Sequence, residues 1–352
     1  MGMLVAAPGA GAVTITVSTN SDDFGATPAT CSLREAIKSA QINSAFDGCP
    51  AGSGADVVSI PGDTYVLSRA GADEDLDVTG DLDVEGTDAL TIQPQDDEAP
   101  VVINANGLDR AFDQQGVNSL SIRNLYITGG ALTLIEDGAG IRNNVGNLTV
   151  EGTTIAGNSS KYSGGGVAVY SSLSMVNSTI SGNSAGGSGG GLYFPNSTGT
   201  VKSSTITDNT ADADADNSGD GGGFADTAAT SVNFFNVILA ANKDLSPVTK
   251  SPDCYSGPNF YPRYVVTTQV LGAGSCLVGF NPGTNIKVDD ALIGALNFDG
   301  RIPVHPLLAG SAAIGAAGTA APDQCPATDQ LGKQRPADGC DIRAVQYVEP
   351  PP

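Results

Sequence analysis

The chain has 352 residues, with 16 basic against 38 acidic side chains, and its formal net charge is −22. Such a charge repels nucleic acids and anionic lipid surfaces, and it disfavours a polyanionic glycan unless a metal ion or a basic patch intervenes. The 46 glycines, together with short Val, Ile and Leu runs separated by Ser, Thr and Asn, predict an all-β fold rich in turns.

The sequences of the two termini indicate where the protein is located. The opening MGMLVAAPGAGA lacks a basic n-region, and we interpret it as the remnant of a removed signal peptide behind a start methionine. The closing EPPP is typical of the start of a Pro-rich linker. No run of the sequence is long enough to span a bilayer. We therefore predict a secreted or cell-surface protein whose signal peptide and any C-terminal anchor lie outside this chain.

A short helix is predicted within CSLREAIKSAQINS, residues 31–44. Ser32 and Glu35 have the spacing of a capping box. The apolar residues that would line one face of the helix are Leu33, Ala36, Ile37 and Ala40. Because an open end of a β structure needs a cover against edge pairing, we assign residues 1–54 to an N-terminal strand and helical cap.

A repeat of about 25 residues follows in the middle of the chain. The unit opens with a Gly cluster whose last members are Gly140, Gly166, Gly191 and Gly223. It closes with Asn158, Asn183, Asn209 and Asn242, which are 25, 26 and 33 residues apart. The spacing between successive Gly markers and the spacing between successive Asn markers increase at the same place, so one loop is inserted between Asn209 and Gly223. A period in this range is typical of a solenoid.

Aligned positions of the repeat stay apolar. These positions are Ile141, Val167, Leu192 and Phe224 after the Gly cluster, Leu148, Leu173 and Val232 in the next run, and Ile155, Ile180, Ile206 and Leu239 before the closing Asn. Alternation of apolar and polar residues points one face of each strand inward. We predict a right-handed parallel β-helix over residues 55–299, with Gly and Asn at sharp turns of positive φ and the Asn side chains stacked as ladders.

The six cysteines fall in three neighbouring pairs, none with C-x-x-C spacing: Cys31 and Cys49, Cys254 and Cys276, and Cys325 and Cys340. An even number in local pairs favours disulfides and an oxidising compartment. We expect each cysteine to pair with its neighbour, although the sequence alone leaves the connectivity open. The alternative is six buried free thiols in a cytosolic protein. Residues 300–352, rich in Pro, Ala and Gly, are predicted to form a disulfide-bearing segment packed on the β-helix.

Both ends of the chain resemble a known group of proteins. CSLREAI, AGSGADVVSIPGDTYVLS, GDLDV and NGLDRAFD resemble the secreted bacterial β-helix proteins named after the CSLREA motif. HPLLAGSAAIGAA and CPATDQLGKQRPADGCDIRAVQY resemble the C-terminal segment of the choice-of-anchor Q group, and the GGG-aliphatic and I-x-x-N repeats are similar to chlamydial polymorphic outer membrane proteins. The resemblance implies a β-helix and, through the chlamydial proteins, adhesion. The chain departs from the pattern at Arg343, where Gly is usual, and at Gln346, where Glu is usual.

Candidate metal ligands lie in two acidic stretches. Alternating carboxylates in the inserted loop have the spacing of calcium-loop ligands: Asp212, Asp214, Asp216 and Asp220. The glycine and the bidentate Glu of an EF-hand are missing, so the alternative is a solvated acidic loop, and no cofactor is required. A second cluster, Asp75, Asp77, Asp81 and Asp83, matches a motif of the CSLREA group and is explained by turn geometry. His305, the single histidine, stands in IPVHPLLAG with no serine motif beside it, and we interpret it as structural.

A binding strip is predicted on the outside of the strands that follow the Gly clusters. Outward positions there are Arg142, Ala168, Tyr193 and Ala225, followed by Asn144, Tyr170, Pro195 and Thr227. Arg142, Tyr170 and Tyr193 would form a shallow strip suited to sugars, against the alternative of scattered surface residues. No column is expected to hold two close carboxylates, as a glycosidase needs, or an Arg beside an Asp cluster.

These observations favour a non-catalytic rod that displays a surface for adhesion or glycan binding. The alternative is a polysaccharide lyase or glycoside hydrolase of the pectate-lyase-like type, which rests on fold analogy alone. A structural spacer or filament subunit is a third possibility. The sequence leaves the ligand, the binding of calcium and the oligomeric state open.

Overall fold

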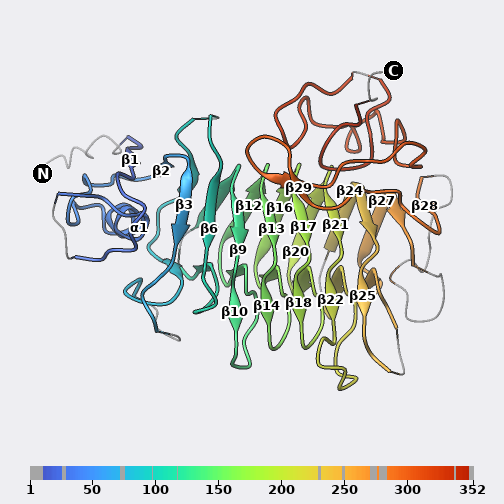
Figure 1. Ribbon diagram of the computed structural model, residues 1–352, viewed down its shortest axis with the longest axis horizontal. Coiled ribbons are helices and arrows are strands. Elements are labelled where there is room, and N and C mark those ends of the chain that lie inside the picture. The colour runs from blue at the N-terminus through green and yellow to red at the C-terminus, as the bar shows by residue number, and fades with distance from the viewer. Residues whose placement is uncertain are drawn as a thin grey trace, which may run out of the picture.

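The computed structural model describes residues 11–25, 29–71, 76–96, 98–116, 118–228, 231–247, 250–269, 276, 284–336 and 338–348. The chain forms an elongated parallel β-solenoid with a helix at one end and the C-terminal segment along one side (Figure 1). The predicted parallel β-helix with its helical cap is confirmed, while its right hand stays a prediction. Residues 1–10 and 349–352, on which the signal-peptide and linker predictions rest, lie outside the described residues.

The helix α1 (Leu33–Ile42) caps the N-terminal end of the solenoid. The predicted capping box is present, because Glu35 N donates to Ser32 Oγ at 3.2 Å and Ser32 N donates to the Glu35 carboxylate at 2.9 Å. The helix ends at Asn43, which takes the left-handed conformation. Its predicted apolar face is buried against the first strands, β1 (Thr14–Thr16), β2 (Asp56–Ile60) and β4 (Leu82–Val84).

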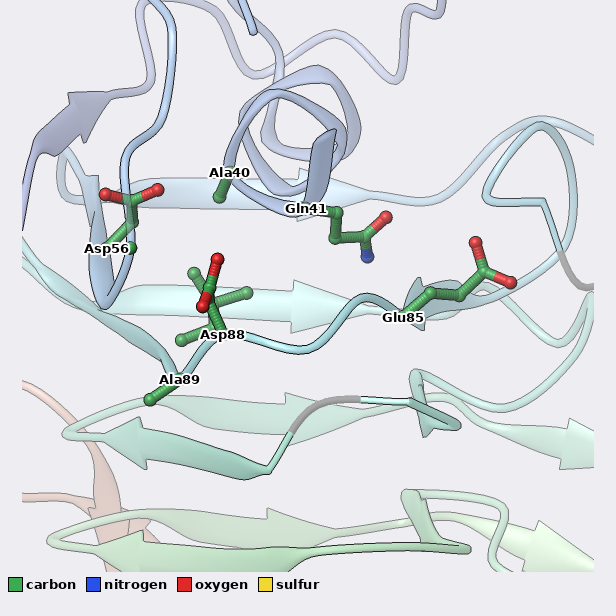
Figure 2. Close-up of a pocket in the computed structure, with 8 residues that line it drawn as sticks. Ala40, Gln41, Asp56, Glu85, Asp88 and Ala89 are labelled. Carbon is green, nitrogen blue, oxygen red and sulfur yellow. The ribbon is translucent and has the colours of Figure 1, made fainter. Parts of the chain in front are cut away.

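A small pocket lies where the cap meets the solenoid, with Gln41 of α1 and Asp56 of β2 in its wall (Figure 2). Its volume of about 10 Å³ leaves room for roughly one water molecule. The Asp56 carboxylate accepts hydrogen bonds from Val13 N at 2.9 Å and Ser53 N at 2.8 Å. The pocket is therefore a joint between cap and solenoid and has no space for an organic ligand.

The largest sheet has 16 strands and two limbs that meet in the long strand β24 (Ser231–Ala240). The first limb holds β1, β2, β5 (Leu90–Pro94), β8 (Ser119–Arg123), β12 (Asn147–Glu151), β16 (Ser172–Val176) and β20 (Thr198–Lys202). The second limb holds β3 (Asp63–Val66), β6 (Val101–Asn104), β9 (Tyr126–Thr128), β13 (Thr154–Ala156), β17 (Thr179–Ser181) and β21 (Thr205–Thr207). Beyond β24 the sheet continues with β27 (Phe260–Thr267) and β28 (Ile286–Lys287).

Two smaller parallel sheets complete each turn. The seven-stranded sheet holds β4, β7 (Phe112–Gln114), β11 (Ile141–Asn143), β15 (Val167–Val169), β19 (Leu192–Phe194), β23 (Phe224–Asp226) and β26 (Cys254–Tyr255). The five-stranded sheet holds β10 (Ala131–Leu132), β14 (Ser159–Ser160), β18 (Ser184–Ala185), β22 (Thr210–Ala211) and β25 (Lys243–Asp244). In the regular repeat a turn therefore runs from the seven-stranded sheet through both limbs to the five-stranded sheet.

The core is a set of apolar columns, as the repeat predicts. The register pairs Ile141 with Val167, Val167 with Leu192, and Leu192 with Phe224, and these side chains are buried. In the first limb, one position of the Leu column is Gly199. A Cβ at Gly199 would lie 2.5 Å from Cε1 of Phe194, so the larger phenyl ring fills the space that the missing side chain leaves.

The closing asparagines form a buried ladder along the axis. Nδ2 of Asn158, Asn183 and Asn209 each donates to Oδ1 of the next asparagine, at 2.9–3.0 Å. The ladder ends where Asn242 Nδ2 donates to Asp253 Oδ1 at 3.1 Å. This part of the prediction is confirmed.

The expectation that these asparagines take positive φ is wrong, because the residue before each one does so: Gly157, Gly182, Asp208 and Ala241. The last Gly of each cluster was expected to form a sharp turn, but glycine is needed there for a different reason. A Cβ at Gly166 would lie 2.6 Å from the carbonyl oxygen of Gly191 in the next turn, so close stacking of the turns requires glycine there.

The C-terminal segment, from residue 300 onward, packs on the outer face of the second limb over its C-terminal part, away from β3 and β6 (Figure 1). Thr154 Oγ1 donates to Pro303 O at 2.7 Å, and Thr179 Oγ1 donates to Gln330 Oε1 at 2.7 Å. These two threonines are paired in register and are fully buried. The segment contains the strand β30 (Pro303–Val304), which pairs antiparallel with β29 (Asn297–Phe298). The segment therefore covers the outer face of β13 and β17.

All three neighbouring cysteine pairs are disulfides, as expected: Cys31–Cys49, Cys254–Cys276 and Cys325–Cys340. The first joins Cys31, just before the N-cap residue Ser32, to Cys49 in the loop after the helix. The third lies within the C-terminal segment. Within the described ranges, no helix combines the length and hydropathy that crossing a membrane requires.

Candidate functional site

The predicted binding strip lies on the outer face of the seven-stranded sheet. Inward residues such as Ile141 are fully buried, and the next residue of each strand points outward. The register aligns one outward residue from every strand, and we call this set the outer column: Asp83, Asp113, Arg142, Ala168, Tyr193, Ala225 and Tyr255. The structure therefore places Arg142 and Tyr193 two strands apart, with Tyr170 just beyond the end of β15.

Glycine-rich turns before these strands fold back over part of the face. Gly164 has a φ of +66°, and a Cβ on it would lie 3.0 Å from Ala168 Cβ. Ala168 is accordingly fully buried, and so is Ala225, whereas Tyr193 is half-buried and Tyr255 is 36% exposed. A Cβ on Gly189 would likewise lie 2.9 Å from Tyr193 Cβ, so the turns cover the small outward residues completely, whereas the larger tyrosine side chains extend beyond them.

At the N-terminal end of the outer column, two arginines are paired with carboxylates. Arg142 donates Nε–H to Asp113 Oδ1 at 3.0 Å and contacts the other carboxylate oxygen through Nη2. Arg110 forms ion pairs with Asp81 at 2.9 Å, Asp113 at 3.5 Å and Glu136 at 2.7 Å. Burial lowers the pKa of Arg110, but the attraction of Asp81 and Asp113 outweighs it and holds the pKa above its ordinary value. Both guanidinium groups are thus permanent cations.

The expectation that no outward column holds an Arg beside an Asp cluster is wrong. Asp83 and Asp113 precede Arg142 in the outer column, and both are fully buried. The repeat is regular only from Gly140 onward, and the two earlier strands have no Gly cluster or closing Asn to mark them. The 29-residue step from Phe112 to Ile141 is the sequence signal that places Asp113 next to Arg142.

Tyr170 reaches back to the turn before β11, where its hydroxyl donates to Asp137 Oδ2. Asp137 also accepts a hydrogen bond from Ser163 N at 2.7 Å. Burial raises the pKa of Asp137, and the hydrogen bonds from Tyr170 and Ser163 offset this only in part. Burial, and then the contact with Asp137, raises the pKa of Tyr170 above its ordinary value. The phenol therefore stays a neutral hydrogen-bond donor.

Four tyrosines lie on or beside this face, and three are well exposed. Tyr162 is 49% exposed, Tyr170 41% and Tyr255 36%. Burial raises the pKa of the fourth, Tyr193, which also interacts with Tyr162. Tyr193 and Tyr255 stand two strands apart in the outer column, about 10 Å along the axis at the usual strand spacing. Each ring offers an apolar face and a polar tip, a combination that suits the faces and hydroxyl groups of sugars.

The two carboxylates of the outer column do not have the setting that a glycosidase needs. A glycosidase needs two carboxylates on either side of the bond, about 5–10 Å apart, whereas Asp83 and Asp113 are buried and Asp113 is paired with Arg142. A lyase needs a base that accepts a proton near neutral pH. The raised pKa of Tyr170 makes its phenolate a rare form.

The inserted loop brings three of the four predicted calcium ligands together. Carboxylate oxygens of Asp212, Asp214 and Asp216 lie within 4.8 Å of one another, and this group does not include Asp220. Asp212 is fully buried, and its carboxylate accepts hydrogen bonds from Asp216 N at 3.0 Å and Asn217 N at 3.2 Å. The carboxylate of Asp212 therefore already holds the loop in its curled form. Calcium binding here stays a prediction.

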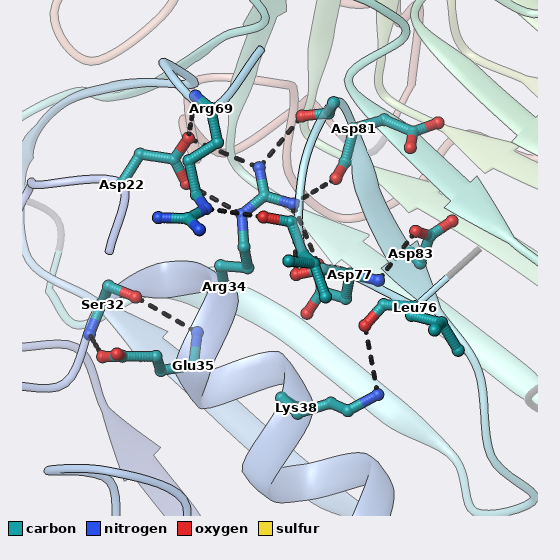
Figure 3. A network of polar contacts seen from close by, with 12 residues as sticks. Asp22, Ser32, Arg34, Glu35, Lys38, Arg69, Leu76, Asp77, Asp81 and Asp83 are labelled. Carbon is teal, nitrogen blue, oxygen red and sulfur yellow. Dashed lines mark hydrogen bonds and ion pairs between the residues drawn. The ribbon is translucent and has the colours of Figure 1, made fainter. Parts of the chain in front are cut away.

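The second acidic cluster joins the cap to the solenoid (Figure 3). Asp75 lies outside the described residues. Arg34 of α1, 1% exposed, forms an ion pair with Asp77 at 3.2 Å and donates to the main-chain oxygen of Asp81. Asp83 Oδ2 accepts from Asp77 N at 3.0 Å. Burial raises the pKa of Asp77 well above its ordinary value, although Arg34 opposes this. These contacts give the cluster a structural role.

His305 is buried at the contact between the C-terminal segment and the second limb. Its Nδ1 lies 2.7 Å from Gly294 O, and its Nε2 lies 2.8 Å from Ser181 Oγ. The carbonyl oxygen can only accept, so Nδ1 carries the proton and Nε2 accepts from the serine hydroxyl. Burial lowers the pKa of His305. Both ring nitrogens form hydrogen bonds within the folded chain, in line with a structural histidine.

Comparison of the chain with protein-family models, with curated proteins and with solved structures finds no match.

Proposed function

We propose that this protein is a secreted or cell-surface rod that binds a neutral glycan through the tyrosines of its seven-stranded sheet, and thereby adheres to another surface. One observation carries the proposal. The outer column changes along the axis from paired charges at Asp113 and Arg142 to emerging rings at Tyr193 and Tyr255. Aromatic residues that are partly exposed in this way are enriched at binding surfaces.

Charge favours a neutral over an acidic glycan. The chain carries −22 overall, and Arg142 and Arg110, the cations next to the tyrosines, are already neutralised by carboxylates. An acidic polymer would meet net repulsion, whereas a neutral one would meet rings and hydroxyl groups. The three disulfides support an extracellular location, as does the resemblance to the CSLREA group.

The test is binding of the full chain to a panel of neutral and acidic polysaccharides, by affinity electrophoresis and calorimetry. Tyr193→Ala and Tyr170→Ala should each weaken binding to the polymer that the wild type prefers. Tyr261→Ala is the matched control, because Tyr261 is 49% exposed but lies on β27 of the 16-stranded sheet. Equal loss in the control, or no binding across the panel, would overturn the proposal.

A lyase or hydrolase is the second candidate, favoured by one observation. Asp137, whose pKa burial raises, lies beside the Tyr170 hydroxyl and interacts with Arg142. A carboxyl group of raised pKa near an Arg and a Tyr resembles a general acid with its supports. Assays of reducing ends and of unsaturated products on the same panel separate the candidates. Product release that Asp137→Asn abolishes would make the protein an enzyme, and binding without release leaves the adhesive rod.

A further inference from the structure

Tyr170 is held on the tyrosine face at two points. Its main-chain N–H donates to Asn143 O at 2.8 Å, and its hydroxyl donates to Asp137 Oδ2. Tyr170 follows the C-terminal end of β15, whereas Asp137 precedes the N-terminal end of β11. The side chain therefore runs back along the outer face between these two points. Because 41% of Tyr170 is exposed, the hydroxyl contact with Asp137 is what fixes the position of the ring.

The carboxyl group of Asp137 holds this hydroxyl firmly only while it is ionised. Asp137 is 5% exposed, and its Oδ1 accepts from Ser163 N at 2.7 Å. A hydrogen bond to a charged oxygen is about twice as strong as one between neutral groups. A main-chain N–H can only donate, so a proton is added more easily at Oδ2, where the Tyr170 hydroxyl can rotate. The tyrosine oxygen would then accept from Asp137, and the direction of the hydrogen bond would reverse.

The other ionisable groups around Asp137 keep their protonation state. Burial raises the pKa of Asp137, and this outweighs its two hydrogen bonds and the charges of Arg142 and Arg110, which lower it. Glu136, the neighbour of Asp137 in the chain, is paired with Arg110 at 2.7 Å. Burial raises the pKa of Tyr193, so this phenol stays neutral. A neutral glycan adds no ionisable group. Asp137 is therefore the group through which a fall in pH acts on this face.

We propose that Asp137 positions Tyr170 on the glycan-binding face and makes that face release its ligand in acid. At neutral pH the ionised carboxylate fixes the ring, and the lone pairs of the Tyr170 hydroxyl accept from hydroxyl groups of the glycan. As pH falls through the pKa of Asp137, the bond weakens and reverses, and the ring loses its fixed position. The proposal rests on the proposed function, glycan binding at the outer column, and adds its regulation.

The state of Tyr170 can be measured without a ligand. In a full chain labelled with 3-fluorotyrosine, the fluorine NMR signal of Tyr170, assigned with Tyr170→Phe, should shift as pH falls from about 7 to about 4, toward the ordinary pKa of an aspartate. Asp137→Asn should abolish the shift. The signal of Tyr261, on β27 of the 16-stranded sheet, is the internal control and should not follow the same curve. A Tyr170 signal that stays constant, or that shifts equally in Asp137→Asn, would overturn the proposal.

Glycan binding is measured by calorimetry over the same pH range, with the neutral polymer that the full chain prefers. The affinity of the wild type should fall about fivefold or more between about pH 7 and about pH 4. Tyr170→Phe keeps the ring and removes the hydroxyl, so its affinity should change less than about twofold over this range. Asp137→Asn should bind weakly throughout. The same pH dependence in the wild type and in both variants would contradict the proposal.

The two measurements separate this proposal from glycan binding itself. A Tyr170 signal that follows Asp137 in a chain that binds no glycan would support the positioning role and sink the proposed function. Glycan binding with a Tyr170 signal that ignores Asp137 would do the reverse.

Thermal unfolding shows whether each variant folds. If Asp137→Asn does not fold, the reciprocal effect decides. The hydrogen bond from Tyr170 lowers the pKa of Asp137, so in Tyr170→Phe the carboxyl carbon signal of Asp137 should titrate at higher pH than in the wild type. An unchanged titration curve would show that the hydroxyl and the carboxylate are not coupled, and the proposal would fail.

Discussion

The two halves of the outer column share one backbone and differ in chemistry. At the N-terminal half, Asp83, Asp113 and Arg142 form buried, paired charges. At the C-terminal half, Ala168 and Ala225 alternate with Tyr193 and Tyr255, and only the rings emerge. Stacking of parallel strands demands fixed inward residues and fixed turns, but it places little restriction on outward residues. The scaffold is therefore uniform, and the chemistry of the outer face varies at positions that the repeat does not restrict.

The largest effect should come from breaking the charged half. Asp113→Ala leaves Arg142 without its buried partner and deprives Arg110 of one carboxylate, which should reduce the free energy of unfolding by about 3–5 kcal/mol. Urea unfolding followed by circular dichroism measures this loss. Asp289→Ala is the control, because its carboxylate is fully exposed. A loss of less than about 1 kcal/mol would mean that water replaces the carboxylate and that the charged half is not a structural unit.

The second largest effect should come from breaking the buried asparagine ladder, which lies beneath both halves of the outer column. Asn183→Ala removes the acceptor of Asn158 Nδ2 and the donor to Ile155 O, and both groups are buried. We expect a loss of about 2–3 kcal/mol in unfolding free energy from these unsatisfied groups. Asn147→Ala, on the exposed start of β12, should cost much less. Equal losses in both variants would contradict a role for the ladder.

In the aromatic half, the effect of removing one ring on glycan binding should depend on the length of the oligosaccharide. Tyr255→Ala removes the ring two strands beyond Tyr193, so long oligosaccharides of the preferred glycan should bind up to tenfold more weakly, about 1.4 kcal/mol. Oligosaccharides too short to span both rings should bind as before. Calorimetry across a series of chain lengths measures the difference. A uniform loss at every length would place both rings in one compact subsite.

Binding of calcium at the inserted loop should have a smaller effect on the stability of the protein. For a dissociation constant of about 0.1–1 mM, 1 mM calcium should add about 0.4–1.4 kcal/mol to the unfolding free energy. Scanning calorimetry with calcium and with chelator measures the shift. The double variant Asp214→Asn, Asp216→Asn should abolish it, while Asp212 still holds the loop. An unchanged midpoint on adding calcium would leave a solvated acidic loop.

The smallest effect should be a change in pH dependence at the boundary between the halves. Burial gives Asp137 a pKa above that of the unfolded chain, so the folded state binds more protons in the window between the two values. Its contribution to stability is full below the unfolded pKa and is lost as pH rises through the folded pKa. Asp137→Asn should therefore lose less stability than the wild type as pH rises above about 3.9, the ordinary pKa of an aspartate. Matching midpoints of the two proteins at every pH would contradict this.

Local signals made most of the fold predictable. The capping box of Ser32 and Glu35, the neighbouring cysteines and the regular Gly-to-Asn unit each specify structure within a few tens of residues. The φ error at the asparagines arose because sequence pattern marks a turn but does not say which of two adjacent residues, such as Gly182 and Asn183, takes the left-handed conformation.

The site was predictable only in part. Arg142 and Tyr193 follow from the register of the repeat, whereas the pairing of Arg142 with Asp113 depends on a strand whose flanks lack the markers of the unit. The contact between Tyr170 and Asp137 spans 33 residues and depends on how a Gly-rich turn folds over the sheet. Contacts of this kind follow from tertiary packing.

The asparagine ladder has a direction, and this determines where the rod can be lengthened. Every side-chain amide in it donates in the same direction, and Asp253, which can only accept, terminates the series. A duplicated unit can be inserted between Asn158 and Asn242 without leaving an amide unsatisfied, but none can be appended past Asp253. Each insertion would lengthen the rod by about 4.8 Å. The distance over which such a protein reaches can therefore change in discrete steps while its two ends stay the same.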